Sequence, residues 1–139
     1  MGAGGSSYDA TLSVALRCLW GVINCVRKSG EILILAECSG GLGSSALEML
    51  VSGKIGGEGG RRREKYVAGL EEVYYLHKLK EDYDVMLLSG LPELYAKSKL
   101  GFATAKGSGE AVKHLLSRAG RTAKVNVVAR AAECRMESS

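Results

Sequence analysis

The chain has 139 residues, of which 46% are apolar and 24% charged, and its formal net charge is +4. These values are typical of one soluble domain with a real core, and they exclude disordered and collagen-like chains. The small positive excess does not imply nucleic acid, because the one dense basic run, residues 61–65, lacks aromatic or groove-reading companions. No apolar run approaches the roughly 20 residues that span a bilayer, so no membrane partner is expected.

The cysteines and histidines do not predict a metal centre. The four cysteines form no CxxC pair, and His77 and His114 lie far from them in sequence. The amino-terminal residues lack the charged and then apolar pattern of a signal peptide. We therefore expect a cytoplasmic protein with reduced thiols.

The first predicted element after a flexible lead at residues 1–7 is a helix that runs to about residue 28. Its apolar residues recur at four- and three-residue spacing and draw one stripe: Leu12, Leu16, Leu19, Ile23 and Val26. Arg17 lies off that stripe. Gly30 suits the end of the helix.

A buried strand is predicted next, at residues 32–36, because this apolar run is too short for a usual helix and has no polar face. A helix follows, and Ser45 and Glu48 have the spacing of a capping box at its start. The loop between this strand and this helix is rich in small residues: Ser39, Gly40, Gly41, Gly43 and Ser44. A strand, a glycine loop and a helix N-terminus favour an anion, so this loop is predicted to face an anion or cofactor. Its GGxG spacing matches no phosphate motif, and a tight turn is the alternative interpretation.

The remaining elements alternate between helix and strand. Residues 52–60 are predicted to form a glycine-rich loop, and a second long helix spans about residues 61–81, with Tyr66, Leu70, Val73 and His77 on one stripe. A buried strand at residues 84–89, a short helix at 93–99, a short strand at 101–104, a helix from Ser108 to Gly120 and a last strand at 124–129 follow. His77 is either a half-buried histidine with a backbone partner or a catalytic base.

This order predicts an α/β fold: one small three-layer α/β/α domain over residues 8–130, followed by an irregular tail at residues 131–139. The sheet is expected to be mostly parallel, Rossmann-like and built of about three to four strands. Ligands in such sheets gather beyond the carboxyl ends of the strands. Cys38 lies at one of these ends, where a helix N-terminus lowers thiol pKa values, so a cysteine nucleophile is a further hypothesis.

The segment 30–44, GEILILAECSGGLGS, resembles the core of the C-terminal domain of nickel-dependent lactate racemases. Residues 8–12, 84–92 and 101–111 are similar to three other pieces of that domain, in the same order. The resemblance covers roughly residues 8–129. It implies a 2-hydroxy-acid racemase-like protein in which this chain closes over a separate catalytic part.

The resemblance implies that the catalytic part is an N-terminal domain or subunit carrying a nickel-pincer nucleotide and two proton-shuttling histidines. That machinery is not in this chain, which therefore resembles an excised domain or a separate subunit that is not catalytic alone. The implied partners are that N-terminal part and a small 2-hydroxy acid, and a homo-oligomer stays open.

The resemblance also implies one binding residue. The family's domain contributes a glutamine and, one helical turn later, a lysine near the substrate, and the matching positions here are Val14 and Arg17. Arg17 would bind a substrate carboxylate, whereas Val14 departs from the pattern because it cannot form a side-chain hydrogen bond. The alternative hypothesis is a stand-alone, non-catalytic anion-binding or protein-interaction module, in which Arg17 is a solvated helix residue.

Overall fold

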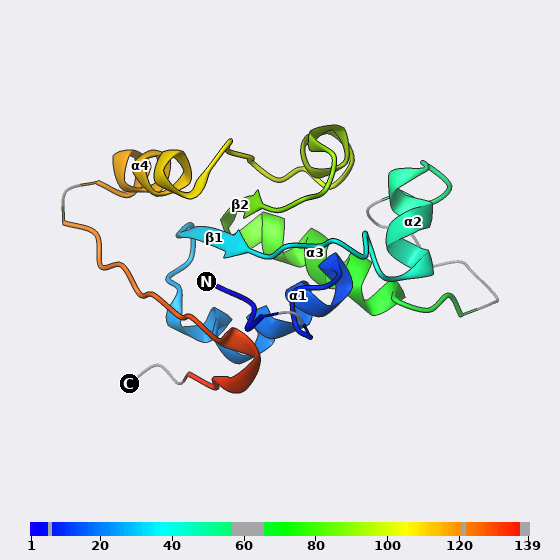
Figure 1. The fold of residues 1–139 in the computed structure, drawn as a ribbon, viewed down its shortest axis with the longest axis horizontal. Helices are drawn as coiled ribbons and strands as arrows, with labels where there is room; N and C mark the ends of the chain where they lie inside the picture. Colours follow the sequence, from blue (N-terminus) through cyan, green and yellow to red (C-terminus); the bar gives the residue numbers. More distant parts are fainter. Residues whose placement is uncertain (6, 57–65, 121, 137–139) are drawn as a thin grey trace.

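The computed structural model describes residues 1–5, 7–56, 66–120 and 122–136 (Figure 1). At its centre β1 (Glu31–Leu35) pairs in parallel with β2 (Asp84–Leu88), with Ile32 opposite Val85 and Ile34 opposite Leu87. Ile34 and Leu87 are fully buried, as expected of strands covered on both faces. Both predicted buried strands are therefore present.

The mixture of helices and parallel strands is consistent with the predicted α/β fold, but the described residues form a two-stranded sheet rather than one of three or four strands. The predicted strand at 101–104 is reduced to a single bridge, in which Ala103 pairs with Met86. Gly101, at φ +72°, turns the chain just before this bridge. The extended conformation therefore begins too late for a longer ladder.

The predicted strand at residues 124–129 also forms no ladder. Its Val127 is 86% exposed, and the segment contacts the sheet edge through the carbonyl of Val128, which accepts from the amide of Gly2 at 2.8 Å. Gly2 in turn bridges Leu35 at the end of β1. The neighbouring chain at this edge is only a few residues long, which is too short to support a further strand. Residues 2 and 3, expected in a flexible lead, are thus bonded to the sheet edge.

The first helix is shorter than predicted. Helix α1 (Leu12–Cys18) buries Leu12 and Leu16 and continues into two 3-10 turns, η1 (Leu19–Gly21) and η2 (Ile23–Cys25). Gly21 lies against the carboxyl-terminal segment, and its carbonyl accepts from the amide of Met136 at 2.7 Å instead of from a later helical amide. A regular helix to residue 28 would lose that contact.

Of the next two helices, α2 lies beyond the carboxyl end of β1 in Figure 1, and α3 runs below the sheet. Helix α2 (Ser45–Val51) is capped by Ser44 rather than by the predicted Ser45, because the Ser44 hydroxyl accepts from the amide of Leu47. Helix α3 (Leu70–Asp82) begins after the expected position; the predicted start at 61–65 lies outside the described residues, as does part of the predicted 52–60 loop.

The carboxyl-terminal half supplies a π-helical turn, η3 (Tyr95–Lys99), and an amphipathic helix, α4 (Ser108–Ala119). Gly107 rather than Ser108 is the N-cap of α4, and the predicted stop at Gly120 is confirmed. A 3-10 turn, η4 (Ala131–Glu133), packs its buried Ala131 near α1, in the region expected to be an irregular tail. Within the described ranges, no helix combines the length and apolarity needed to cross a membrane.

Candidate functional site

The loop at residues 38–44 follows β1 and packs against the beginning of α1. Several of its backbone amides donate hydrogen bonds to carbonyls of the protein. The amide of Cys38 donates to the carbonyl of Asp9 and that of Gly40 to the carbonyl of Ala10, both at 2.7 Å. The amide of Gly41 donates to the carbonyl of Cys38 at 2.9 Å. The predicted anion cradle needed these amides of Gly40 and Gly41 to face outward. Their bonds instead fix the shape of the loop.

The loop also completes the N-terminus of α1. The carbonyls of Gly41 and Leu42 accept from the amides of Leu12 and Ser13, each at 3.0 Å, and so satisfy two first-turn donors of the helix. Gly43, at φ +81°, lies so close to the Thr11 side chain that a Cβ there would overlap it. At least part of the glycine content of this loop therefore serves close packing.

The rim of the loop remains open to solvent. Ser39, Gly40 and Gly43 are exposed, whereas Ser44 is half-buried and caps α2. A ligand at this end of the sheet would meet these exposed residues first.

Arg17 lies on α1 and forms a close pair with a carboxylate of α3. Its Nε and Nη2 donate to Oε1 of Glu72 at 2.9 and 2.6 Å, and Nη2 lies 3.9 Å from Oε1 of Glu71. The Arg17 side chain is 52% exposed, whereas Glu72 is completely buried. The guanidinium is therefore held on one edge by a buried anion and reaches solvent on the other.

Glu72 connects Arg17 with the loop. Its Oε1 also accepts from the Ser13 hydroxyl at 2.6 Å, and the amide of Ser13 is bonded to the loop at Leu42. Oε2 of Glu72 is buried without a hydrogen-bond partner among the described residues. Ser44 and this Oε2 both lie against Gly69, where a Cβ would overlap the serine and approach Oε2 to 2.9 Å. Arg17 and the loop, predicted separately, thus belong to one neighbourhood.

Glu72 is the residue of this site that the sequence interpretation missed. It precedes Leu76 and Leu79 by four and seven residues, which places it on their buried face of α3. The predicted stripe instead contained His77, whose side chain is 43% exposed and lies 3.4 Å from Glu81. A helical register based on Leu76 would have placed a carboxylate in the core and His77 outside it.

The environment of Cys38 disfavours the cysteine-nucleophile hypothesis. The residue is 3% exposed. Burial raises the pKa of the Cys38 thiol to about 11, and the carboxylates of Asp9 and Glu37 add to the effect. A thiol of this pKa is protonated at neutral pH, and the thiolate is the nucleophile.

The described residues do not supply a metal site. Across residues 1–5, 7–56, 66–120 and 122–136, no group of three or more His, Cys, Asp or Glu side chains is placed to hold a metal ion. The nickel-pincer nucleotide is implied by the resemblance, which assigns it to the N-terminal part. It stays an expectation about a companion part.

Comparison with known proteins gives a structural match. No family model and no curated protein matches the sequence. The structure is similar to that of the lactate racemase apoprotein from Thermoanaerobacterium thermosaccharolyticum, with a TM-score of 0.83 and 19% sequence identity. The match covers 99% of this chain. The chain has a lactate-racemase-like fold.

The same comparison limits what the likeness shows. The chain covers 34% of the length of that racemase apoprotein, so it corresponds to a part of the larger protein. At 19% identity the likeness shows the fold, and it assigns no role to Arg17 or Val14. Val14, one turn before Arg17 on α1, is half-buried.

Proposed function

We propose that this chain is the C-terminal, substrate- and cofactor-capping domain or subunit of a racemase-related protein that acts on a small 2-hydroxy acid. In this proposal the chain is not catalytic alone. An N-terminal catalytic part carries the nickel-pincer nucleotide. The observation that carries the proposal is the likeness to a lactate racemase apoprotein over 99% of this chain but only 34% of that one.

The geometry around Arg17 supports a role in holding a carboxylate. Glu72 engages Nε and Nη2, and no described residue bonds to Nη1, so the Nη1 donors of this half-exposed guanidinium can meet an incoming anion. A buried carboxylate that fixes one edge of an arginine lowers the entropy lost when the other edge binds. In this arrangement Glu72 positions Arg17, and Arg17 contacts the substrate.

The loop supports the same proposal through its location. Ser39, Gly40 and Gly43 form the exposed rim beyond the carboxyl end of β1, where ligands of α/β sheets gather. Hydrogen bonds run from Leu42 to Ser13, from Ser13 to Glu72 and from Glu72 to Arg17, which supports a shared role for the loop and Arg17. The rim would lie over the substrate, and the companion part would supply the acid and base groups.

A lactate titration tests the substrate half of the proposal. Lactate at about one hundred times its dissociation constant should raise the melting temperature of the chain by about 5 °C or more, by mass action on the native state. Arg17→Gln should remove this response, whereas Arg27→Gln, an exposed arginine beyond η2, should retain it. A lactate response that survives Arg17→Gln would contradict the role of Arg17.

Co-expression with a candidate N-terminal half tests the other part of the proposal. The expected result is a stable complex that racemises a 2-hydroxy acid, measured by chiral chromatography. Neither half alone should be active. Failure of the halves to associate, together with no racemisation of any 2-hydroxy acid, would overturn it.

The second candidate function is a stand-alone, non-catalytic anion-binding or protein-interaction module. The ion pair of Arg17 with Glu72 favours it over a dedicated 2-hydroxy-acid site, because a guanidinium already paired with a carboxylate does not need a substrate carboxylate as its counter-ion. This function predicts that the chain stays monomeric beside any N-terminal half and responds to anions without preference for a 2-hydroxyl group. Equal responses to acetate and lactate would select it over the racemase-related function.

A further inference from the structure

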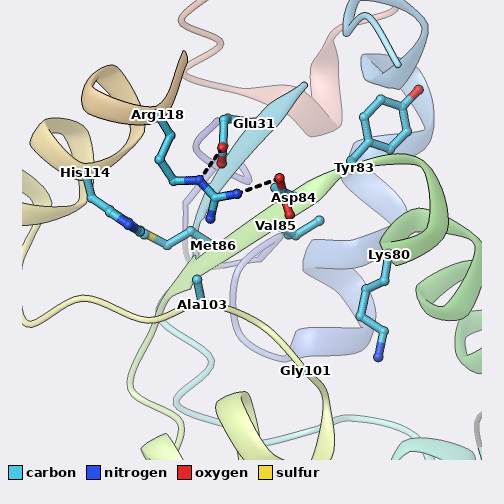
Figure 2. A pocket seen from close by; sticks show the side chains of 10 residues that line it. All are labelled: Glu31, Lys80, Tyr83, Asp84, Val85, Met86, Gly101, Ala103, His114 and Arg118. Carbon is cyan, nitrogen blue, oxygen red and sulfur yellow. Dashed lines mark hydrogen bonds and ion pairs between the residues drawn. The ribbon is translucent and has the colours of Figure 1, made fainter. Parts of the chain in front are cut away.

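A cavity of about 230 Å³ lies at the other end of the sheet, beside the first residues of β1 and β2. Its walls come from the strands, from the end of α3, from the segment at residues 101–103 and from α4 (Figure 2). The charged and titratable side chains on these walls are Glu31, Lys80, Tyr83, Asp84, His114 and Arg118. None of them belongs to the site at Arg17.

One part of the cavity carries two carboxylates and one guanidinium. Nε of Arg118 lies 2.8 Å from Oε1 of Glu31, and its Nη2 lies 2.7 Å from Oδ2 of Asp84. Each of these carboxylates has a second oxygen. A single positive charge between two negative charges leaves this cluster with an excess of about one negative charge.

Lys80 stands apart from that cluster, as Figure 2 shows. Its Nζ donates to the carbonyl of Leu100 at 2.9 Å, and among the described residues no carboxylate lies within ion-pair distance of it. Gly101 makes room for the ammonium group, because a Cβ at this position would lie 2.9 Å from Nζ. Burial lowers the pKa of Lys80, which reflects the cost of a partly desolvated charge without a counter-ion.

We propose that this cavity binds a small zwitterion of the amino-acid class. Lys80 pairs with its carboxylate, and the free oxygens of Glu31 and Asp84 accept from its ammonium group. The volume of about 230 Å³ is far above the roughly 10–15 Å³ that one water needs, so a small organic molecule such as an amino acid with a short side chain has room. This ligand site is separate from the proposed function and does not depend on it.

Alanine, propionate and ethylamine form a matched set of probes, because the last two each carry one of the two charges of alanine. Calorimetric titrations at constant ionic strength and about pH 7 should show alanine binding at least tenfold more tightly than either single-charge compound. Lys80→Gln and Asp84→Asn should each weaken alanine binding tenfold or more. Lys113→Gln, an exposed lysine of α4 outside the cavity, should leave it unchanged.

Two results would overturn the proposal. Propionate binding as tightly as alanine would show a simple anion site, and no alanine binding to the unmodified chain would show that the cavity is not a ligand site. Lys80→Arg is the charge-conserving variant, and it should retain more alanine affinity than Lys80→Gln. Loss of lactate binding in Arg17→Gln, with alanine binding intact, would separate the two sites.

Discussion

The two ends of the sheet use charged side chains in opposite ways. At the carboxyl end, Glu72 is completely buried and accepts from both Nε and Nη2 of Arg17. At the amino end, Arg118 bridges two carboxylates, and among the described residues the one hydrogen-bond partner of Lys80 Nζ is the carbonyl of Leu100. A charge fixed by a buried partner is suited to orient a ligand, whereas an unpaired charge on a cavity wall is suited to attract one.

The largest stability effect is expected at the carboxyl end, from Glu72→Ala. This change removes the buried partner of Arg17 and Ser13 and should lower the free energy of unfolding by about 3 kcal/mol, at the lower end of the range for a buried pair because Arg17 is half-exposed. Urea unfolding measures it. The matched control is Glu71→Ala, whose side chain is 46% exposed and which should cost no more than about 0.5 kcal/mol. Equal losses in the two variants would show that Glu72 is not the buried anchor.

Cysteine labelling tests whether the carboxyl end is sealed. Burial raises the pKa of the Cys38 thiol to about 11, roughly two units above that of an ordinary thiol, which alone reduces the thiolate fraction about a hundredfold at about pH 8. Because Cys38 is also only 3% exposed, it should react with iodoacetamide much more slowly than the exposed Cys134. Peptide mass spectrometry of a time course gives both rates. Faster labelling of Cys38 would restore the cysteine-nucleophile hypothesis.

A pair of glycine substitutions compares two positions of the loop at the carboxyl end. Gly43→Ala should lower the free energy of unfolding by about 2 kcal/mol or more, because the positive φ is strained for alanine and the new Cβ would overlap Thr11. Gly41→Ala has a similar φ of +80° but open space around the new Cβ, so it should cost about 1 kcal/mol. Equal effects in chemical denaturation would mean that the loop does not press against α1.

The smallest effect is expected at the amino end, from Arg118→Gln. Because Arg118 is 45% exposed, its loss should cost about 1 kcal/mol at neutral pH. Burial raises the pKa of Glu31 and Arg118 opposes this, so folding favours the protonated acid. Stability from this group is therefore present below the ordinary carboxyl pKa and falls as pH rises through the folded value.

Removing Arg118 raises the pKa of Glu31 further, so the free energy of unfolding decreases by a larger amount as pH rises. The melting temperatures of the unmodified chain and Arg118→Gln should therefore differ most at about pH 7 and converge toward about pH 4, where the carboxylates gain protons. A constant difference across that range would show that Arg118 acts through packing rather than charge.

The sequence predicted the local elements better than the arrangement of the side chains. The apolar runs at residues 32–36 and 84–89 correspond to β1 and β2, and Gly120 ends α4 as expected. The prediction of a strand at 124–129 was wrong. A strand needs a neighbouring strand to pair with, and the neighbouring segment at the sheet edge is only a few residues long. Local pattern does not report the length of a distant partner.

The candidate site was predictable only in pieces. Arg17 and the 38–44 loop could be named from sequence, but Glu72, which links them, could not be separated from the solvated acids of a helix without the correct register of α3. The cavity at Lys80 depends on four chain segments that meet only in the folded protein. Such convergence leaves no spacing signal in the sequence.

Lactate carries a hydroxyl group where alanine carries an ammonium group, and the two are otherwise the same. A titration with lactate therefore tests the carboxyl end of the sheet, and a titration with alanine tests the cavity at the amino end. In amide NMR spectra, lactate should shift the signals of Arg17 and of the loop rim at Ser39 and Gly43, while those of Lys80 and Gly101 stay in place. Lactate shifts confined to Lys80 and Gly101, or absent throughout, would contradict the assignment of the 2-hydroxy-acid site to the carboxyl end.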